Sequence, residues 1–433
     1  MSPTTAGIIG IILLVIFLFS RMPVGFVMGL LGFAGFAWQV DLSAAVALIS
    51  RDLFSIFANY DLTVIPLFVL MGQIAFQSGI SRRLYDSAYV IFGHRRGGLA
   101  MATVGACAAF SAVSGSTNAT AATMAVVTLP EMKRHGYDMG LATGTVAAAG
   151  SLGILIPPSV IFIVYGILTE QSIGKLFAAG IIPGIILTIL FLVTIQIRVW
   201  INPALAPPGP RTTFREKARS FIGVLETLLL FGMVVGGMFF GIFTPTEAAA
   251  VGAFLTLAIA VIRRQITWPG FIRSLADTTR ISCMVMMIVA GAVIFGHFMA
   301  ITRVPFTLAE WISGLPLPGW AIMGMIVLVY LFGGCFMDAL AMVMLTVPIF
   351  YPLVLAVGFD PIWFGVTVVL ITEMGVITPP VGVNVYVVAG VAKDVPLETI
   401  FKGVLPMLVP LIICTILLLF FPEIALFLPR LMH

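Results

Sequence analysis

The chain has 433 residues, of which 61% are hydrophobic and only 9% charged, and its formal net charge is +4. Because an ordinary soluble domain has roughly 25% charged residues, this composition excludes a water-soluble fold. The basic residues lie in short clusters between apolar runs, a pattern that sets membrane topology and gives no indication of a nucleic-acid partner. A membrane-spanning helix needs about 20 apolar residues, so we expect one all-α polytopic membrane domain with about ten spans.

Continuous apolar runs predict the spans in chain order. They lie at 5–20, 24–38, 61–79, 139–169, 174–200, 221–242, 246–262, 281–301, 361–391 and 395–421. Two further apolar regions, 99–130 and 321–350, are too rich in small, polar and proline residues to be simple spans. We interpret each as a re-entrant hairpin, which enters the membrane and returns to the same side.

The flanking charges favour hairpins, because basic loops face the cytoplasm. Basic residues flank region 99–130 at both ends: Arg82, Arg83, Arg95 and Arg96 precede it, and Lys133 and Arg134 follow it. Region 321–350 lies between a segment whose only basic residue is Arg303 and another that carries Asp360 and no Lys or Arg, as is typical of an external face. The hairpins are therefore expected to enter from opposite sides. An external N-terminus also fits the basic segments 198–219 and 263–280, which we expect to be cytoplasmic loops.

The chain matches itself at a shift of 222 residues without a gap. The shift superposes Gly97 on Gly319, Phe110 on Phe332, Pro130 on Pro352, Gly136 on Gly358, Asp138 on Asp360, Gly153 on Gly375, Pro157 on Pro379 and Pro158 on Pro380. Chance similarity between apolar segments would not keep glycine, proline and aspartate in register. Since the two units have opposite predicted orientations, we expect an inverted repeat, which is common among secondary transporters.

Four segments follow from these patterns. Residues 1–60 are expected to hold scaffold spans and an amphipathic arm, and residues 201–280 a connecting loop and scaffold spans. Residues 61–200 form the first repeat, with its hairpin at 99–130 and a broken span at 139–169. Residues 281–433 form the second repeat, with its hairpin at 321–350 and a broken span at 361–391.

Small polar residues gather at the expected tip of the first hairpin, where Ser111, Ser114, Gly115, Ser116, Thr117, Asn118 and Thr120 lie close in sequence. Hydroxyl, amide and freed carbonyl oxygens are ligands that an alkali cation accepts without a formal negative charge. The alternative is a close helix contact made by small residues, which membrane proteins use widely. We favour the site, because an asparagine without a partner is costly in hydrocarbon.

Two double prolines interrupt predicted spans, in the segments Gly150 to Ser159 and Gly375 to Asn384. A proline removes a backbone donor and leaves an upstream carbonyl unpaired. At membrane depth such carbonyls are tolerated only where they line a cavity or are buried in protein. Either break alone could be a plain kink, but paired breaks in two inverted halves predict a transport site.

Acidic residues within apolar segments have both structural and functional interpretations. Asp338, which matches Ser116 in the repeat, either binds a cation or caps the second helix of its hairpin. Glu247 follows Thr244 by three residues and is expected to form a capping box. We interpret Glu373 and His297 as satisfied buried groups.

Several motifs are missing from the sequence. No Gly-x-x-x-x-Gly-Lys-Ser/Thr occurs, so the chain cannot itself be an ATPase. No His-Glu-x-x-His, no Cys/His array for a transition metal and no Gly-x-Ser-x-Gly elbow occurs either, so we do not expect an enzyme. The energy for transport must come from an ion gradient or from a separate subunit.

Five motifs together resemble the large membrane subunit of the tripartite ATP-independent periplasmic (TRAP) transporters. They lie at 65–72, 150–159, 243–252, 338–348 and 378–384, and the resemblance covers nearly the whole chain. It implies two opposed hairpins, an elevator-type mobile domain like that of the ion-transporter superfamily, and sodium coupling without another cofactor. It also implies two partners, a small four-helix membrane subunit and a periplasmic substrate-binding protein, and a location in a bacterial or archaeal inner membrane.

The resemblance also implies site residues. The expected sodium ligands are Ser114, Ser116, Asn118, Gly153, Pro157, Gly334, Asp338, Thr378, Gly382 and Asn384. The expected substrate contacts are Ser116, Thr117, Ser159, Thr378, Pro379 and Asn384. Our main hypothesis is sodium symport of a small carboxylate or sulfonate delivered by a binding protein. The alternatives are a self-sufficient sodium/anion carrier of the same architecture and, from another class, a membrane enzyme or passive channel.

Overall fold

The computed structural model describes residues 2–19, 22–209, 212–313 and 318–432, and all regular elements within these ranges are helices. The all-helical prediction is therefore confirmed. The N-terminal elements are α1 (Pro3–Phe19), α2 (Val24–Gln39), α3 (Leu42–Phe57), η1 (Tyr60–Thr63), α4 (Val64–Gln77) and α5 (Ile80–Phe92). The next are α6 (Gly98–Ser114), α7 (Thr117–Arg134), α8 (Met139–Ala149), α9 (Leu152–Leu155), α10 (Val160–Thr169) and α11 (Ile173–Ile201).

A middle group follows: η2 (Pro203–Leu205), α12 (Phe214–Phe239), α13 (Pro245–Ile262), α14 (Trp268–Thr302) and α15 (Val304–Ser313). The C-terminal group is α16 (Gly319–Gly334), α17 (Ala339–Ala356), α18 (Pro361–Ile377), α19 (Val383–Val391), α20 (Leu397–Phe420) and α21 (Glu423–Arg430). Seven helical segments among the described residues have the length and hydropathy to cross a membrane. They are 60–77, 139–169, 173–201, 245–262, 268–302, 339–356 and 397–420.

One sequence prediction about a helix boundary was wrong, and one helix was not predicted. The basic segment 263–280 is mostly helix, because α14 begins at Trp268 after a cap by Thr267 and continues without interruption through the predicted span 281–301. Helix α5 falls outside every predicted span. In both places polar residues on one face lower the mean hydropathy, which measures suitability for lipid and not helix formation.

Helix starts recur at the spacing of 222 residues. Helices α7 and α17 start at residues 117 and 339, and α8 and α18 start at residues 139 and 361. The residue before each start accepts a backbone hydrogen bond from the first turn: Ser116 and Asp138 in one half, Asp338 and Asp360 in the other. The double prolines interrupt the helix in both halves, between α9 and α10 and between α18 and α19.

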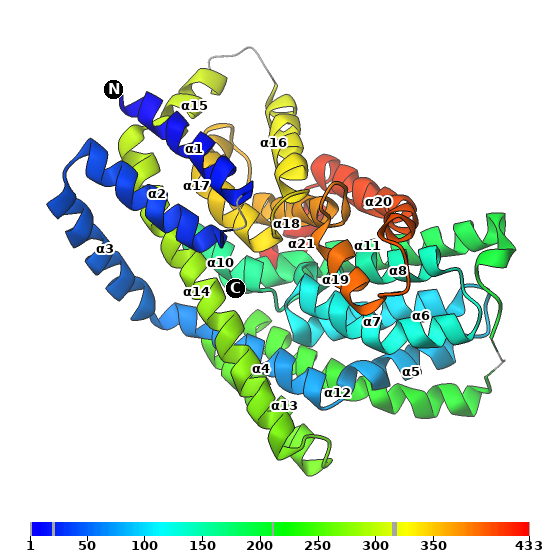
Figure 1. The fold of residues 1–433 in the computed structure, drawn as a ribbon. Coiled ribbons are helices and arrows are strands. Elements are labelled where there is room, and N and C mark those ends of the chain that lie inside the picture. Colours follow the sequence, from blue (N-terminus) through cyan, green and yellow to red (C-terminus); the bar gives the residue numbers. More distant parts are fainter. Residues whose placement is uncertain (1, 20–21, 210–211, 314–317, 433) are drawn as a thin grey trace.

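The helices form two groups that meet along a central seam (Figure 1). Helix α14 packs against α2 and α4, and α4 packs against α13. On the other side of the seam α7 packs against α19, and α8 packs against α20, so segments from the two halves lie side by side. The buried side chains form one apolar core that continues from α2 and α4 into α18 and α20.

The two halves are also connected at the ends of α7 and α17. Lys133 near the end of α7 forms an ion pair with Asp394, which follows α19. Tyr351 near the end of α17 donates a hydrogen bond of 3.3 Å to the carbonyl of Thr169 at the end of α10 and accepts one of 3.1 Å from Gln171. In the repeat α7 matches α17, and α19 matches α10. The end of α7 meets the end of α19, and the end of α17 meets the end of α10, so matched helix ends are in contact twice, with the halves exchanged.

Candidate functional site

The first half contributes a break of two residues between α6 and α7. Gly115 ends α6 in the left-handed region, with φ of 64°, which a glycine adopts without strain. Ser116 then caps α7, and its hydroxyl accepts a bond of 3.4 Å from the amide of Ala119. The Ser114 hydroxyl donates to the Ser116 carbonyl at 3.3 Å and hydrogen-bonds the Thr120 hydroxyl at 2.9 Å. This tip therefore gathers neutral oxygens at the end of a buried helix.

The break after α9 packs directly on this tip. A Cβ atom on Gly153 would lie 2.5 Å from the carbonyl oxygen of Ser116 and 2.7 Å from the Thr120 hydroxyl, so only glycine fits there. The amide of Val160 donates to the carbonyl of Gly115 at 3.3 Å. Ser114, Ser116 and Gly153, three of the predicted sodium ligands, are thus brought together, and Pro157 lies buried in the same break.

The second half repeats this arrangement. Gly334 ends α16 against Gly375 of α18, and a Cβ on Gly334 would lie 3.1 Å from the Cα of Gly375. Asp338 caps α17 by accepting a bond of 3.1 Å from the amide of Leu340, so its expected capping geometry is present. The amide of Gly382 donates to the carbonyl of Cys335 at 3.4 Å, which holds the break after α18 against the tip.

Side chains from the two halves meet at adjacent positions of α7. Asn118 donates a hydrogen bond of 3.2 Å to Asp338 Oδ1. Asn384 donates bonds of 2.8 Å to the Thr117 hydroxyl and 3.2 Å to the Ala147 carbonyl. Thr117 in turn donates to Glu373 Oε2 at 3.4 Å. These bonds form two groups on adjacent residues of α7, and each group joins residues more than 200 positions apart in sequence. We call the two groups together the polar network.

A cavity of about 70 Å³ lies where this network meets the other helix group. Ser114, Ser116, Thr117 and Asp338 line one side, and Gln73 of α4 and Ile281 of α14 contribute from the other. Among the residues that the structure describes, Asp338 is the only charged one that lines the cavity, and no Lys or Arg does. Pockets that enclose drug-sized ligands measure roughly 300–1,000 Å³, so this conformation has room for an ion or a few waters and not for an organic anion of that size.

Other predicted site residues lie away from this cavity. Ser159 is fully buried and its hydroxyl caps α10. The Thr378 hydroxyl donates to the carbonyl of Met374 at 2.5 Å, and Pro379 is exposed. Asn384 is buried behind Thr117. None of these four residues lines the cavity, although Asn384 reaches it through a hydrogen bond.

Sequence reasoning missed two contributors to the site. Gln73 lines the cavity from α4. Glu373 was expected to be satisfied, but its Oε1 atom has no hydrogen-bond partner among the described residues and its side chain is fully buried. An acid within the apolar run 362–377, with no basic residue nearby in sequence, was the available signal.

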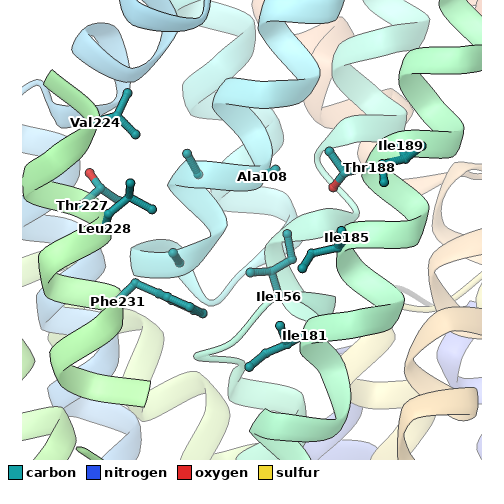
Figure 2. A pocket seen from close by; sticks show the side chains of 12 residues that line it. Ala108, Ile156, Ile181, Ile185, Thr188, Ile189, Val224, Thr227, Leu228 and Phe231 are labelled. Carbon is teal, nitrogen blue, oxygen red and sulfur yellow. The ribbon is translucent and has the colours of Figure 1, made fainter. Parts of the chain in front are cut away.

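Larger pockets lack the chemistry of an anion site. One of about 260 Å³ lies between α6, α11 and α12, and Thr188 and Thr227 are the only polar residues in its described lining. Figure 2 shows Phe231 of α12 and Ile185 of α11 on opposite sides of it. A second, of about 750 Å³, lies between α1, α16 and α17, and Thr346 is its only polar side chain. Neither brings together the convergent polar groups that bind small ligands.

Comparisons with known proteins identify the family. The family model described as "Tripartite ATP-independent periplasmic transporter, DctM component" matches residues 11–424. The chain belongs to this family. The resemblance found in the sequence is therefore confirmed, and since the relatives are transporter permeases, this TRAP large permease is a membrane transport subunit and not an enzyme.

Individual relatives of this permease are named for different organic anions. It is 38% identical to the C4-dicarboxylate TRAP transporter large permease DctM of Pseudomonas aeruginosa, over 89% of this chain and 90% of that protein. It is 36% identical to the sialic acid large permease SiaM of Vibrio cholerae, over 96% of both chains. It is 37% identical to the isethionate permease DctMQ of Oleidesulfovibrio alaskensis, over 95% of this chain and 64% of that protein.

A solved transporter structure has the same fold. The YdaH transporter of Alcanivorax borkumensis aligns with a TM-score of 0.68, covering 98% of each chain at 15% sequence identity. At this identity the likeness concerns the fold alone.

Proposed function

We propose that this permease carries a small organic anion, a carboxylate or a sulfonate, across the inner membrane by sodium symport. The observation that carries the proposal is the meeting of both helix-pair tips around the cavity between Ser116 and Asp338, which is also lined by Ile154 and Val160 on either side of the first break. Broken helices expose unpaired acceptors at membrane depth, where secondary transporters bind their ions and substrates. The named substrates of the relatives, C4-dicarboxylate, sialic acid and isethionate, are all organic anions.

The charge of the site supports coupling to a cation. The polar network contains two acidic residues, Asp338 and Glu373, and none of its members is basic. An anionic substrate would be repelled by this network as it stands. Sodium bound by the neutral oxygens of Ser114, Ser116 and Asn118 would supply positive charge, and the N-terminal ends of α7 and α17 would add partial positive charge. Ion and anion binding would then be coupled, typically by about 1–3 kcal/mol.

The proposed mechanism is an elevator movement of an inverted repeat, with the pairs α6–α7 and α16–α17 as re-entrant hairpins. Helix starts that recur after 222 residues, and the contacts of Lys133 and Tyr351 that recur with the halves exchanged, support the repeat. The small volume of the cavity, about 70 Å³, supports movement, because separation of its walls would make room for an organic anion. In this mechanism the two hairpins and the two broken spans, α8–α10 and α18–α19, move as one body along α4 and α14.

The family relationship supports two partners. We propose that a small four-helix membrane subunit and a periplasmic binding protein work with this chain, and that the binding protein delivers the anion. The rival is a self-sufficient sodium/anion carrier with the same fold, and no observation favours it over the tripartite system.

Uptake into proteoliposomes tests the proposal. Vesicles with the permease and its membrane partner receive radiolabelled succinate, sialic acid or isethionate, with and without the cognate binding protein, under inward sodium or potassium gradients. We expect uptake of one anion that requires both sodium and the binding protein. Uptake that is equal in potassium would refute symport, and uptake without the binding protein would favour the self-sufficient carrier.

A further inference from the structure

A third apolar pocket, of about 240 Å³, lies at the corner between α13 and α14, at the lower edge of Figure 1. Both helices have the length and hydropathy of membrane spans, so we expect the turn that joins them, residues 263–267, at a membrane surface. The last turns of α13, the joining turn and the first turn of α14 form this corner pocket. Its described lining is Leu257, Val261, Ile266, Thr267, Trp268 and Phe271.

The walls of the corner pocket suit an acyl chain at the edge of the hydrocarbon. Thr267 is the only polar residue in the described lining, and its hydroxyl already accepts a hydrogen bond of 3.3 Å from the amide of Gly270. Leu257 lies five residues before the end of α13, so it is about 8 Å deeper in the membrane than the turn. The ring centroids of Trp268 and Phe271 are 5.8 Å apart, and tryptophan favours the level of the lipid headgroups.

The joining turn is basic and incompletely neutralised. Arg263 forms an ion pair with Glu226 of α12, but Arg83 of α5 also pairs with that carboxylate, at 3.4 Å. None of the ion pairs between described residues involves Arg264, which is exposed. The sequence from 263 to 276 contains no acidic residue. One carboxylate therefore faces two guanidinium groups, and Arg264 adds a further positive charge next to the pocket.

A lipid fits this corner better than a helix of a membrane partner. One helical turn, about 10 Å across and about 5.4 Å long, occupies roughly 400 Å³. This volume exceeds that of the corner pocket, whereas an acyl chain is narrower than a helix. A phospholipid also carries its phosphate at the headgroup level, directly beyond its acyl chains. Basic turns between spans face the cytoplasm, where they attract the anionic lipids of that leaflet.

We propose that the corner between α13 and α14 binds an anionic phospholipid, with one acyl chain in the pocket and the phosphate at Arg264. The phosphate neutralises positive charge that Glu226 leaves uncompensated. Since α14 packs against α2 and α4, the bound lipid anchors this helix group at the cytoplasmic leaflet. The lipid site shares no lining residue with the cavity between Ser116 and Asp338.

Phospholipids with a photoreactive acyl chain test the site in the full chain. The permease is placed in phosphatidylcholine nanodiscs that contain a minor fraction of photoreactive phosphatidylglycerol or photoreactive phosphatidylcholine, and the labelled peptides are identified by mass spectrometry after illumination. We expect the phosphatidylglycerol probe to label residues 257–271 about fivefold more than the phosphatidylcholine probe, which is the preference that one arginine near a membrane surface supplies. Equal labelling by the two probes would overturn the proposal.

Variants separate the headgroup contact from the acyl contact. Arg264→Gln should bring labelling by the two probes close to equal. Arg264→Gly should do the same without backbone strain, because Arg264 has a φ of 54°, which glycine adopts freely. Arg273→Gln is the matched control, since it removes the same charge about 200° around α14 from Phe271, and it should keep the preference. Val261→Trp fills the pocket and should lower labelling by both probes. A preference that persists in both Arg264 variants, or unchanged labelling in Val261→Trp, would refute the site.

The same measurement with the proposed small membrane subunit identifies the alternative occupant. We expect labelling of residues 257–271 to persist when the subunit is bound. Loss of labelling by both probes would show that the corner is a protein interface and would overturn the lipid site. None of these measurements needs sodium or an organic anion. Their failure would therefore leave the symport proposal intact, and failure of sodium-driven uptake would leave the lipid site intact.

Discussion

Gly153→Ala tests whether the contact between the first tip and the first break forms the sodium site. The added Cβ would lie 2.5 Å from the Ser116 carbonyl oxygen and 2.7 Å from the Thr120 hydroxyl. An ordinary contact distance of 3.4 Å requires the break and the tip to separate by about 0.9 Å at the closer of these contacts. Overpacking of this kind costs about 1–3 kcal/mol. If the bound ion requires the original spacing, this free energy corresponds to a loss of sodium affinity of roughly fivefold to 150-fold.

Sodium-dependent thermal stabilisation measures this loss without a substrate. At sodium concentrations well above the dissociation constant, each tenfold loss of affinity lowers the stabilisation by about 1.4 kcal/mol. Potassium chloride at equal ionic strength serves as the reference. Gly105→Ala is the matched control, since its Cβ would lie in the same helix pair at an ordinary 3.5 Å from Phe92. Equal sodium stabilisation of Gly153→Ala and Gly105→Ala would refute the reasoning.

Three further predictions concern the first tip, the elevator movement and the cap of α12. Asn118→Ala should raise the sodium concentration required for half-maximal uptake about fivefold or more and weaken the apparent anion affinity at fixed sodium. Leu190→Ala is the control and should change neither quantity. If Asn118→Ala keeps the sodium dependence of the wild type, the tip is a helix contact and not a sodium site. Cysteines introduced at Val69 and Ala119, which both line the cavity, should stop uptake when a short bifunctional reagent joins them, and undiminished uptake in fully crosslinked protein would contradict the elevator. The hydrogen bond from the backbone of Thr213 lowers the pKa of the exposed Glu216 carboxyl. The contribution of Glu216 to stability should therefore be present above its unfolded-state pKa and decline as the pH falls through the lower folded-state pKa. Thermal unfolding of Glu216→Gln should lack this decline, and a variant with the same acid profile as the wild type would contradict the prediction.

Much of the fold could be predicted because its signals are local. Apolar runs indicate helices, double prolines mark both breaks, and the cap expected as one interpretation of Asp338 is present. The capping box of Thr244 and Glu247 was predicted from three-residue spacing and is present. Helix α5 and the first turns of α14 were missed, because their polar residues bring the mean hydropathy below that of a membrane span.

The site was less predictable because its decisive contacts join distant residues. Nothing in the sequence near Thr117 indicates that it bonds both Glu373 and Asn384, and only packing of α7 against α18 and α19 brings them together. For the same reason Glu373 was interpreted as satisfied, although one of its oxygens has no partner in the described part of the chain. Thr378 and Ser159 were expected in the site, but each of these hydroxyls hydrogen-bonds the backbone of its own helix end.

The central claim is that sodium and an organic anion share one site at the cavity where the two helix-pair tips meet α4 and α14. Simultaneous uptake of radioactive sodium and a labelled anion, by vesicles containing the permease with its partners, tests it most directly. The account predicts a fixed ratio of sodium to anion in the wild type, with both fluxes reduced together in Asn118→Ala. Anion uptake without accompanying sodium, or an unchanged pair of fluxes in Asn118→Ala, would contradict it.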